Sequence, residues 1–198
     1  MSVKIGVILG STRTNSLGEK LFKYLQQAMP TADVDFTWID LKDYPLPFYD
    51  HAETPLSEAI QGLAPIEEQW LNVLKAQDGY VILSPEYDHA ITGSLKNALD
   101  FVGPETDHKP VQIVTYSKYS DGGALAAASV VEILQMLKMM VLPAPVLLWN
   151  AEPNFTADGT LVKTAPNSDH FAKRLAAAFD ELVHYATLMK AHPYQAKS

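Results

Sequence analysis

Short apolar runs alternate along the chain with segments in which apolar residues recur every three or four positions. The first run, residues 3–9, is rich in β-branched residues and almost continuously apolar, which is typical of a strand covered on both faces. Similar runs predict strands over 34–39, 79–84, 111–116 and about 141–149. The pattern therefore predicts five strands, most of them buried.

The segments between these runs predict helices. Helical spacing starts at Leu17 and is ended by Pro30, because the proline ring is incompatible with a helix interior. The remaining predicted helices cover 56–63, 66–74 after a break or restart at Pro65, 93–101, the stretch from Gly122-Gly123 to Leu137, and about Ser168 to Met189. Residues 150–166, with Pro153 and Asp158-Gly159, predict a turn or hairpin.

This alternation over 198 residues favours one domain, residues 1–198, with an open parallel sheet and helices on both faces. No internal repeat or interdomain linker interrupts it. In such folds ligands bind beyond the carboxyl ends of the strands. The segments after the first, third and fourth strands are therefore where we expect the chemistry.

Composition narrows the classes of function. Fifteen Lys and Arg against 23 Asp and Glu give a formal charge of −8, so we expect neither a nucleic-acid nor a membrane partner. The absence of cysteine excludes disulfides and thiolate chemistry, and six scattered histidines predict no metal site. Residues 1–5 do not resemble a signal peptide, and no apolar run approaches about 18 residues. We therefore expect a cytoplasmic protein.

The loop after the first predicted strand, residues 10–16, offers hydroxyls, an amide and a guanidinium ahead of a helix. Free N–H groups at a helix start and the fork of Arg13 suit an anion. The loop lacks the glycine patterns that bind nucleoside triphosphates or dinucleotides, and its hydroxyls suit a terminal phosphate, as in FMN-binding flavodoxin-like sheets. The same Ser and Thr residues could merely cap the helix, so the loop alone leaves both interpretations open.

The loop after the third predicted strand begins Pro85-Glu86-Tyr87. A rigid proline followed by an aromatic residue can place Tyr87 against a flat ligand, although a turn with a surface tyrosine is the plainer interpretation. Together with Gly93-x-Leu95-Lys96-Asn97-Ala98-Leu99-Asp100, this loop resembles the signature of the NAD(P)H-dependent FMN reductase family, flavodoxin-like enzymes that include quinone, azo-dye and chromate reductases.

The resemblance extends to residues 10–16, to Asp78-Gly79, and to Ser117 with Gly122-Gly123, and it spans about residues 3–147. It implies a flavodoxin-like three-layer α/β/α fold whose five-stranded parallel sheet has the order 2-1-3-4-5. By this resemblance the FMN-binding residues are Ser11, Arg13, Asn15, Ser16, Leu17, Pro85, Glu86, Tyr87, Asp88, Ser117 and Gly122.

The implied activity is an FMN-dependent oxidoreduction. NADPH or NADH would give a hydride to the flavin, which would pass electrons to a quinone or a similar small-molecule acceptor. No catalytic side chain is expected, because the flavin carries the chemistry. The resemblance also implies a homodimer or homotetramer, to which the aromatic, proline-rich segment 44–49 could contribute unless it seals its own sheet edge.

Four positions depart from the family pattern. Asp88 stands where asparagine is usual, Ala90 replaces a serine, Thr92 replaces a proline, and Tyr119 replaces the first glycine after the fourth strand. An ionised Asp88 beside the flavin would lower its reduction potential. The alternative function is a flavodoxin-like electron carrier or a flavin-bound redox sensor without substantial turnover, since these classes share the fold.

Overall fold

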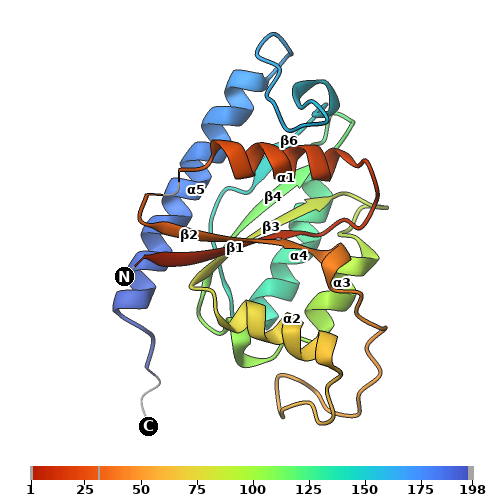
Figure 1. Cartoon of the computed structure of the whole chain (residues 1–198), viewed down its shortest axis with the longest axis vertical. Helices are drawn as coiled ribbons and strands as arrows, with labels where there is room; N and C mark the ends of the chain where they lie inside the picture. The colour runs from red at the N-terminus through yellow and green to blue at the C-terminus, as the bar shows by residue number, and fades with distance from the viewer. Residues whose placement is uncertain (1, 31, 196–198) are drawn as a thin grey trace.

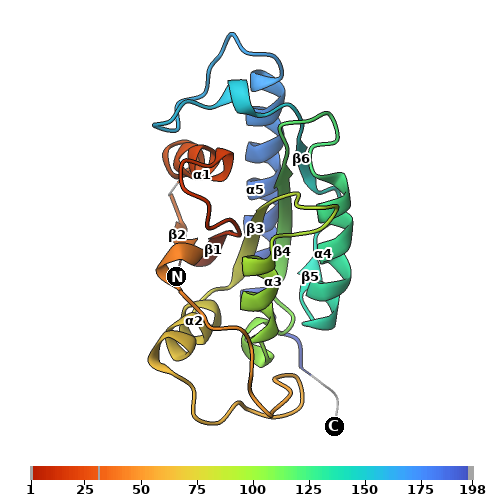
Figure 2. The same cartoon turned by 90° about the vertical axis from the view of Figure 1, so that its right-hand side faces the viewer.

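The computed structural model describes residues 2–30 and 32–195. At its centre lies a parallel sheet in the order β2-β1-β3-β4-β5 (Figures 1 and 2). Its strands are β1 (Val3–Leu9), β2 (Val34–Asp40), β3 (Gly79–Pro85), β4 (Pro110–Tyr116) and β5 (Met140–Val141), and β6 (Val146–Leu148) also pairs with β4. The predicted parallel sheet and its strand order are confirmed.

The prediction of one fifth strand over 141–149 is wrong. β5 pairs with the beginning of β4, and β6 pairs with the end of the same strand. Between them, Pro143 and Pro145 lack the N–H groups that a continuous ladder needs, and Ala144 has a φ of 57°. The prolines therefore divide the edge of the sheet into two short strands.

Helices cover both faces of the sheet and complete the predicted three layers (Figures 1 and 2). On one face lie α1 (Leu17–Ala28) and α5 (Ser168–Ala191). On the other lie α2 (Pro65–Lys75), α3 (Gly93–Asp100) and α4 (Ala124–Met136). In the described part of the chain, no helix combines the length and apolarity needed to cross a membrane.

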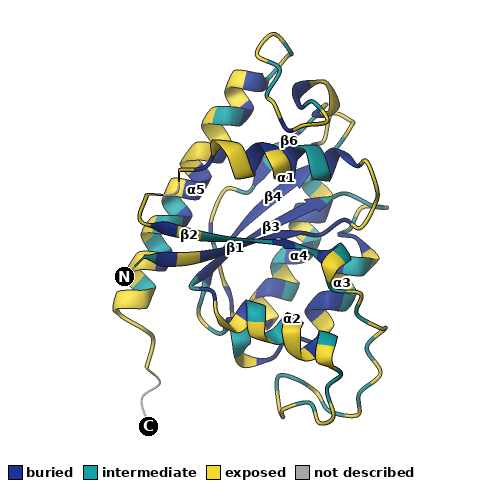
Figure 3. Cartoon of the chain, in the orientation of Figure 1, coloured by how far each residue is buried: buried dark blue, intermediate teal, exposed yellow. Residues whose placement is uncertain are grey.

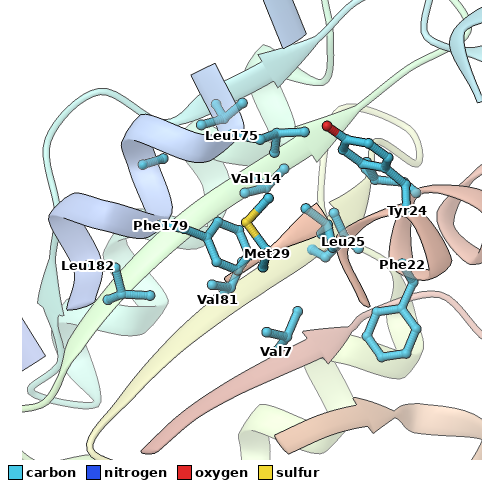
Figure 4. Close-up of a cluster of buried hydrophobic side chains, with 14 of the residues drawn as sticks. Val7, Phe22, Tyr24, Leu25, Met29, Val81, Val114, Leu175, Phe179 and Leu182 are labelled. Carbon is cyan, nitrogen blue, oxygen red and sulfur yellow. The ribbon is translucent and has the colours of Figure 1, made fainter. Parts of the chain in front are cut away.

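Each face of the sheet has its own hydrophobic cluster, and the central strands between them are buried (Figure 3). Figure 4 shows the first cluster, in which Val7, Val81 and Val114 from three neighbouring strands meet side chains of α1 and α5. In the second cluster Trp70 is fully buried, and its indole N–H donates to the Ala98 carbonyl at 2.8 Å. Each large apolar side chain buried in this way contributes about 1.5–3 kcal/mol.

The predicted helix over 56–63 is absent. Thr54 accepts backbone hydrogen bonds from Ser57 and Glu58, but this single turn does not propagate, and Gly62 has a φ of 67°. An isolated helical turn is costly to nucleate, so a short run of apolar residues is not enough to hold one. Pro65 then occupies the first position of α2, so a helix begins at this proline as the sequence indicates.

The aromatic segment 44–49 is fastened to its own chain. Asn97 of α3 accepts a hydrogen bond from the Tyr49 N–H at 3.1 Å and donates to the Pro47 carbonyl at 2.8 Å. Between these anchors the Phe48 side chain is 87% exposed. The segment thus packs on the second cluster through Tyr44 and Tyr49 while presenting one aromatic side chain outward.

Candidate functional site

A cleft of about 330 Å³ opens where β1, β3 and β4 end, between the loops that follow these strands. These loops lie far apart in the sequence, and the parallel sheet brings them to one edge. Of the predicted site residues, the cleft brings together Ser11, Arg13, Asn15, Ser16, Leu17, Pro85, Glu86, Tyr87 and Ser117. Asp88 and Gly122 lie outside its lining.

The loop after β1 leads into a well-capped helix. The Ser16 hydroxyl accepts from the Glu19 N–H at 3.1 Å, and the Glu19 carboxylate accepts from the Ser16 N–H at 3.2 Å. In the described structure this leaves the backbone N–H groups of Leu17 and Gly18 without a partner. The loop therefore combines both interpretations, because Ser16 caps the helix while two donors stay available to an anion.

Two cations line the cleft, but only one is paired among the described residues. Lys118 forms an ion pair with Glu152 at 2.8 Å, and its hydrogen bond holds the pKa of Glu152 below the usual value. Arg13 is exposed and makes no ion pair with any described residue. The Arg13 guanidinium is thus the positive charge in the cleft that is left for a ligand.

The loop after β3 is a tight hairpin. Tyr87 and Ala90 exchange two backbone hydrogen bonds of 2.9 Å, and the two residues between them, Asp88 and His89, have φ values of 47° and 66°. Positive φ at both central positions defines a type I′ turn, in which Asn and Asp are favoured. The exposed Asp88 therefore serves the turn, and it does not reach the cleft where the sequence placed it.

Glu86 joins this loop to α4. One carboxylate oxygen accepts from the N–H groups of Leu125 and Ala126, both at 3.0 Å, and the other lies 3.3 Å from the His89 Nδ1. A carboxylate at this position caps the helix and complements its dipole. Glu86 thus lines the cleft as predicted, but its oxygens are used to hold the loop in place.

Thr92, a departure from the family pattern, has a similar role. Its hydroxyl accepts from the Leu95 N–H at 3.1 Å, which caps α3, and it donates to the Gly10 carbonyl at the end of β1. It therefore ties the loop after β3 to the loop after β1.

The loop after β4 supplies the third wall. The Ser117 hydroxyl accepts from the Tyr119 N–H at 2.9 Å, and the Tyr119 side chain stands at the rim with 77% exposure. Gly122 lies outside the cleft lining and has a φ of 64°, and a β-carbon on it would stand 3.1 Å from that of Leu147. Both the positive φ and the close packing against Leu147 require glycine at this position. The predicted Gly122 therefore has a structural role next to β6 and does not line the cleft.

The sequence interpretation missed Tyr116, Lys118 and Glu152. Lys118 follows Ser117 in the loop after β4, so its position alone could have indicated it, whereas Tyr116, the last residue of β4, looks like a core residue in the sequence. Glu152 belongs to the 3₁₀ helix η3 (Glu152–Asn154), and no sequence signal places this helix near the cleft. In residues 2–30 and 32–195, no group of three or more potential ligands is arranged to hold a metal ion.

The sequence model of the NADPH-dependent FMN reductase family matches residues 3–153. The chain belongs to this family. The reductase is 32% identical over 151 residues to an NAD(P)H-dependent FMN reductase of Nectria sp, an alignment that covers 73% of this chain and 74% of that protein. It is also 32% identical over 151 residues to a quinone reductase of Escherichia coli K12, covering 73% and 77% of the two chains.

Among solved structures, the reductase is similar to the flavoenzyme NAD(P)H:(acceptor) oxidoreductase of Paracoccus denitrificans. The TM-score is 0.74 at 24% identity, and the match covers 94% of this chain and 98% of that one. This likeness shows the flavodoxin-like fold. Family membership confirms the predicted enzyme class, with FMN as the cofactor and NADPH or NADH as the electron donor, and it favours an enzyme over an electron carrier.

Proposed function

We propose that this reductase binds FMN in the cleft at the ends of β1, β3 and β4 and passes electrons from NAD(P)H to a quinone or a similar acceptor. The observation that carries the proposal is that Arg13 and Leu17 line the same cleft, while the N–H groups of Leu17 and the adjacent Gly18, at the start of α1, have no partner among the described residues. These groups suit the FMN phosphate.

The rest of the cleft also suits FMN. Its volume of about 330 Å³ falls in the range of about 300–1,000 Å³ that is usual for small-molecule sites. Tyr87 and Pro85 present aromatic and apolar surface to a flat ring, a contact worth about 0.5–1.5 kcal/mol beyond burial for an aromatic pair. The hydroxyls of Tyr87 and Tyr116 are buried without a hydrogen-bond partner in the described structure, so polar atoms of a ligand could satisfy them.

The residues of the chain have a binding and orienting role in this proposal. FMN, when bound, supplies the redox chemistry. Arg13 and the start of α1 hold the phosphate, and the loop of Tyr87, fixed by Glu86 on α4, sets where the ring lies. The single cleft then has to admit NAD(P)H and the acceptor in turn.

The proposed class of electron acceptor rests on the name of a relative. The Escherichia coli relative bears the name quinone reductase, and this name supports a quinone as the acceptor here. We further propose that the enzyme works in the cytoplasm, a reducing compartment with which a chain without cysteine is compatible. The outward Phe48 of the segment 44–49 supports a homodimer or homotetramer.

Steady-state kinetics test this proposal. Initial rates of NADPH oxidation by the FMN-loaded protein, measured at several fixed concentrations of a benzoquinone, should give parallel double-reciprocal lines, because oxidised nicotinamide must leave before the quinone can enter. Intersecting lines would reject the shared cleft. Oxidation of no more than one NADPH per protein with excess quinone would instead indicate a carrier or sensor.

A further inference from the structure

Tyr116 has a buried hydroxyl whose role the fold does not explain. The residue ends β4, is 3% exposed and lines the cleft. Its hydroxyl has no hydrogen-bond partner among the described residues, although the Ser11 hydroxyl lies near it. An unsatisfied buried hydroxyl is costly, so a residue that serves only packing would be better as phenylalanine.

The surroundings of this hydroxyl are those of an anion site. It lies against the first turn of α1, so closely that a β-carbon at Gly18 would overlap it. The turn that it touches carries the two N–H groups left over by the Ser16 cap. Arg13 is also near enough for its charge to act on the phenol. Arg13, the start of α1 and Tyr116 thus line one cleft, with the Tyr116 hydroxyl against the first turn of the helix.

The proton of this hydroxyl is firmly held. Burial, with a smaller contribution from the neighbouring Tyr87, raises the pKa of Tyr116 far above its ordinary value. The phenol is therefore neutral under physiological conditions and can donate a hydrogen bond. A phosphate can accept from all these donors at once, because it is rich in oxygen and negatively charged.

We infer that the Tyr116 hydroxyl donates a hydrogen bond to the FMN phosphate and is a determinant of the preference for FMN over riboflavin. The inference rests on the proposed place of FMN in the cleft. The Tyr116 hydroxyl, at the end of β4, is a neutral donor that complements the charged Arg13 guanidinium of the loop after β1. It also gives Gly18 a function, because only glycine leaves room for the hydroxyl beside the helix.

Titrations of apo-protein with FMN and with riboflavin test the inference without relying on activity. Tyr116→Phe should raise the Kd for FMN by about 10- to 100-fold, the range expected for a hydrogen bond to a charged group, while the Kd for riboflavin stays unchanged. Gly18→Ala, which leaves the hydroxyl in the protein but displaces it, should weaken FMN selectively as well.

Two other tyrosines provide matched controls. Tyr80→Phe removes a buried hydroxyl that donates to the Leu74 carbonyl at 2.7 Å, and it should leave both ligands unaffected. Tyr87→Phe removes the other unpartnered hydroxyl of the cleft. Because the proposed function sets Tyr87 against the flavin ring, which FMN and riboflavin share, this variant should change the Kd for both ligands by the same factor.

Thermal unfolding gives an independent readout. Without FMN, Tyr116→Phe should melt at the wild-type temperature or above, because an unsatisfied hydroxyl has been removed. With FMN, the variant should gain less stability than the wild type does. A loss of stability that is equal with and without FMN would mean a purely structural role and would overturn the inference.

The outcomes separate this inference from the proposed function. If the wild type binds FMN and Tyr116→Phe binds it equally well, or loses FMN and riboflavin affinity in equal measure, the inference is wrong and the proposed cleft stands. If Arg13→Ala and Tyr116→Phe both leave FMN binding unchanged, the proposed place of the phosphate fails with it.

Discussion

At the scale of single residues, the sequence predicts the side chains of the loop after β1 that line the cleft, but it does not predict Tyr116 at the end of β4. Hydroxyls and Arg13 before a helix are a local pattern, so sequence alone predicted their place. Tyr116 escaped because a tyrosine at a strand end looks like any other core residue, and only the fold reveals its unpartnered hydroxyl. The resemblance to the family predicts Asp88 beside the flavin, whereas in the structure the turn leaves it exposed.

Arg13 carries the first prediction at this scale. Arg13→Ala should weaken FMN by about 10- to 100-fold, because a charge-assisted hydrogen bond is worth about 1.5–3 kcal/mol, and riboflavin affinity should not change. Fluorescence titration measures both constants. Lys118→Ala is the matched control, since the Lys118 charge is already paired with Glu152 and its loss should have a smaller effect. Equal losses for FMN and riboflavin in Arg13→Ala would contradict the assignment.

At the scale of elements, the sequence predicted what depends on local periodicity and missed what depends on neighbours. The helices from Leu17, Gly93 and Ser168 form where the spacing indicates. The predicted helix over 56–63 is absent because no further backbone hydrogen bonds extend its single turn. The predicted fifth strand is divided in two because Pro143 and Pro145 interrupt its hydrogen-bond ladder. The contact of Glu86 with α4 links elements about 40 residues apart, so no local pattern could show it.

This contact leads to a prediction about stability. Glu86→Ala should lower the free energy of unfolding by about 1–2 kcal/mol, because the N–H groups of Leu125 and Ala126 lose their acceptor, and Glu86→Gln should cost less than half as much. Urea unfolding measures the change. Glu132→Ala, an exposed position on the same helix, should stay within about 0.5 kcal/mol. A Glu86→Ala variant no less stable than Glu132→Ala would refute the capping role.

At the scale of the whole molecule, the sheet order places the cleft. Because β1, β3 and β4 are neighbours and parallel, the loops that follow them meet at one edge, and three weak local signals become one site. The alternation of strands and helices predicted a parallel sheet with the ligand at this edge, and the order of the strands came from the resemblance to the family. The exact lining was not, because it depends on side-chain packing, as Gly122 shows by facing β6 instead of the cleft.

A crystal structure with FMN bound tests the central claim most directly. The account predicts the phosphate within hydrogen-bond distance of the Leu17 and Gly18 N–H groups and the Tyr116 hydroxyl, with the ring against Tyr87. Density for FMN elsewhere would contradict it, for example in the hollow of about 540 Å³ beside Lys109 and Tyr194 at the other end of the sheet. A bound FMN with its phosphate turned away from α1 would contradict it equally.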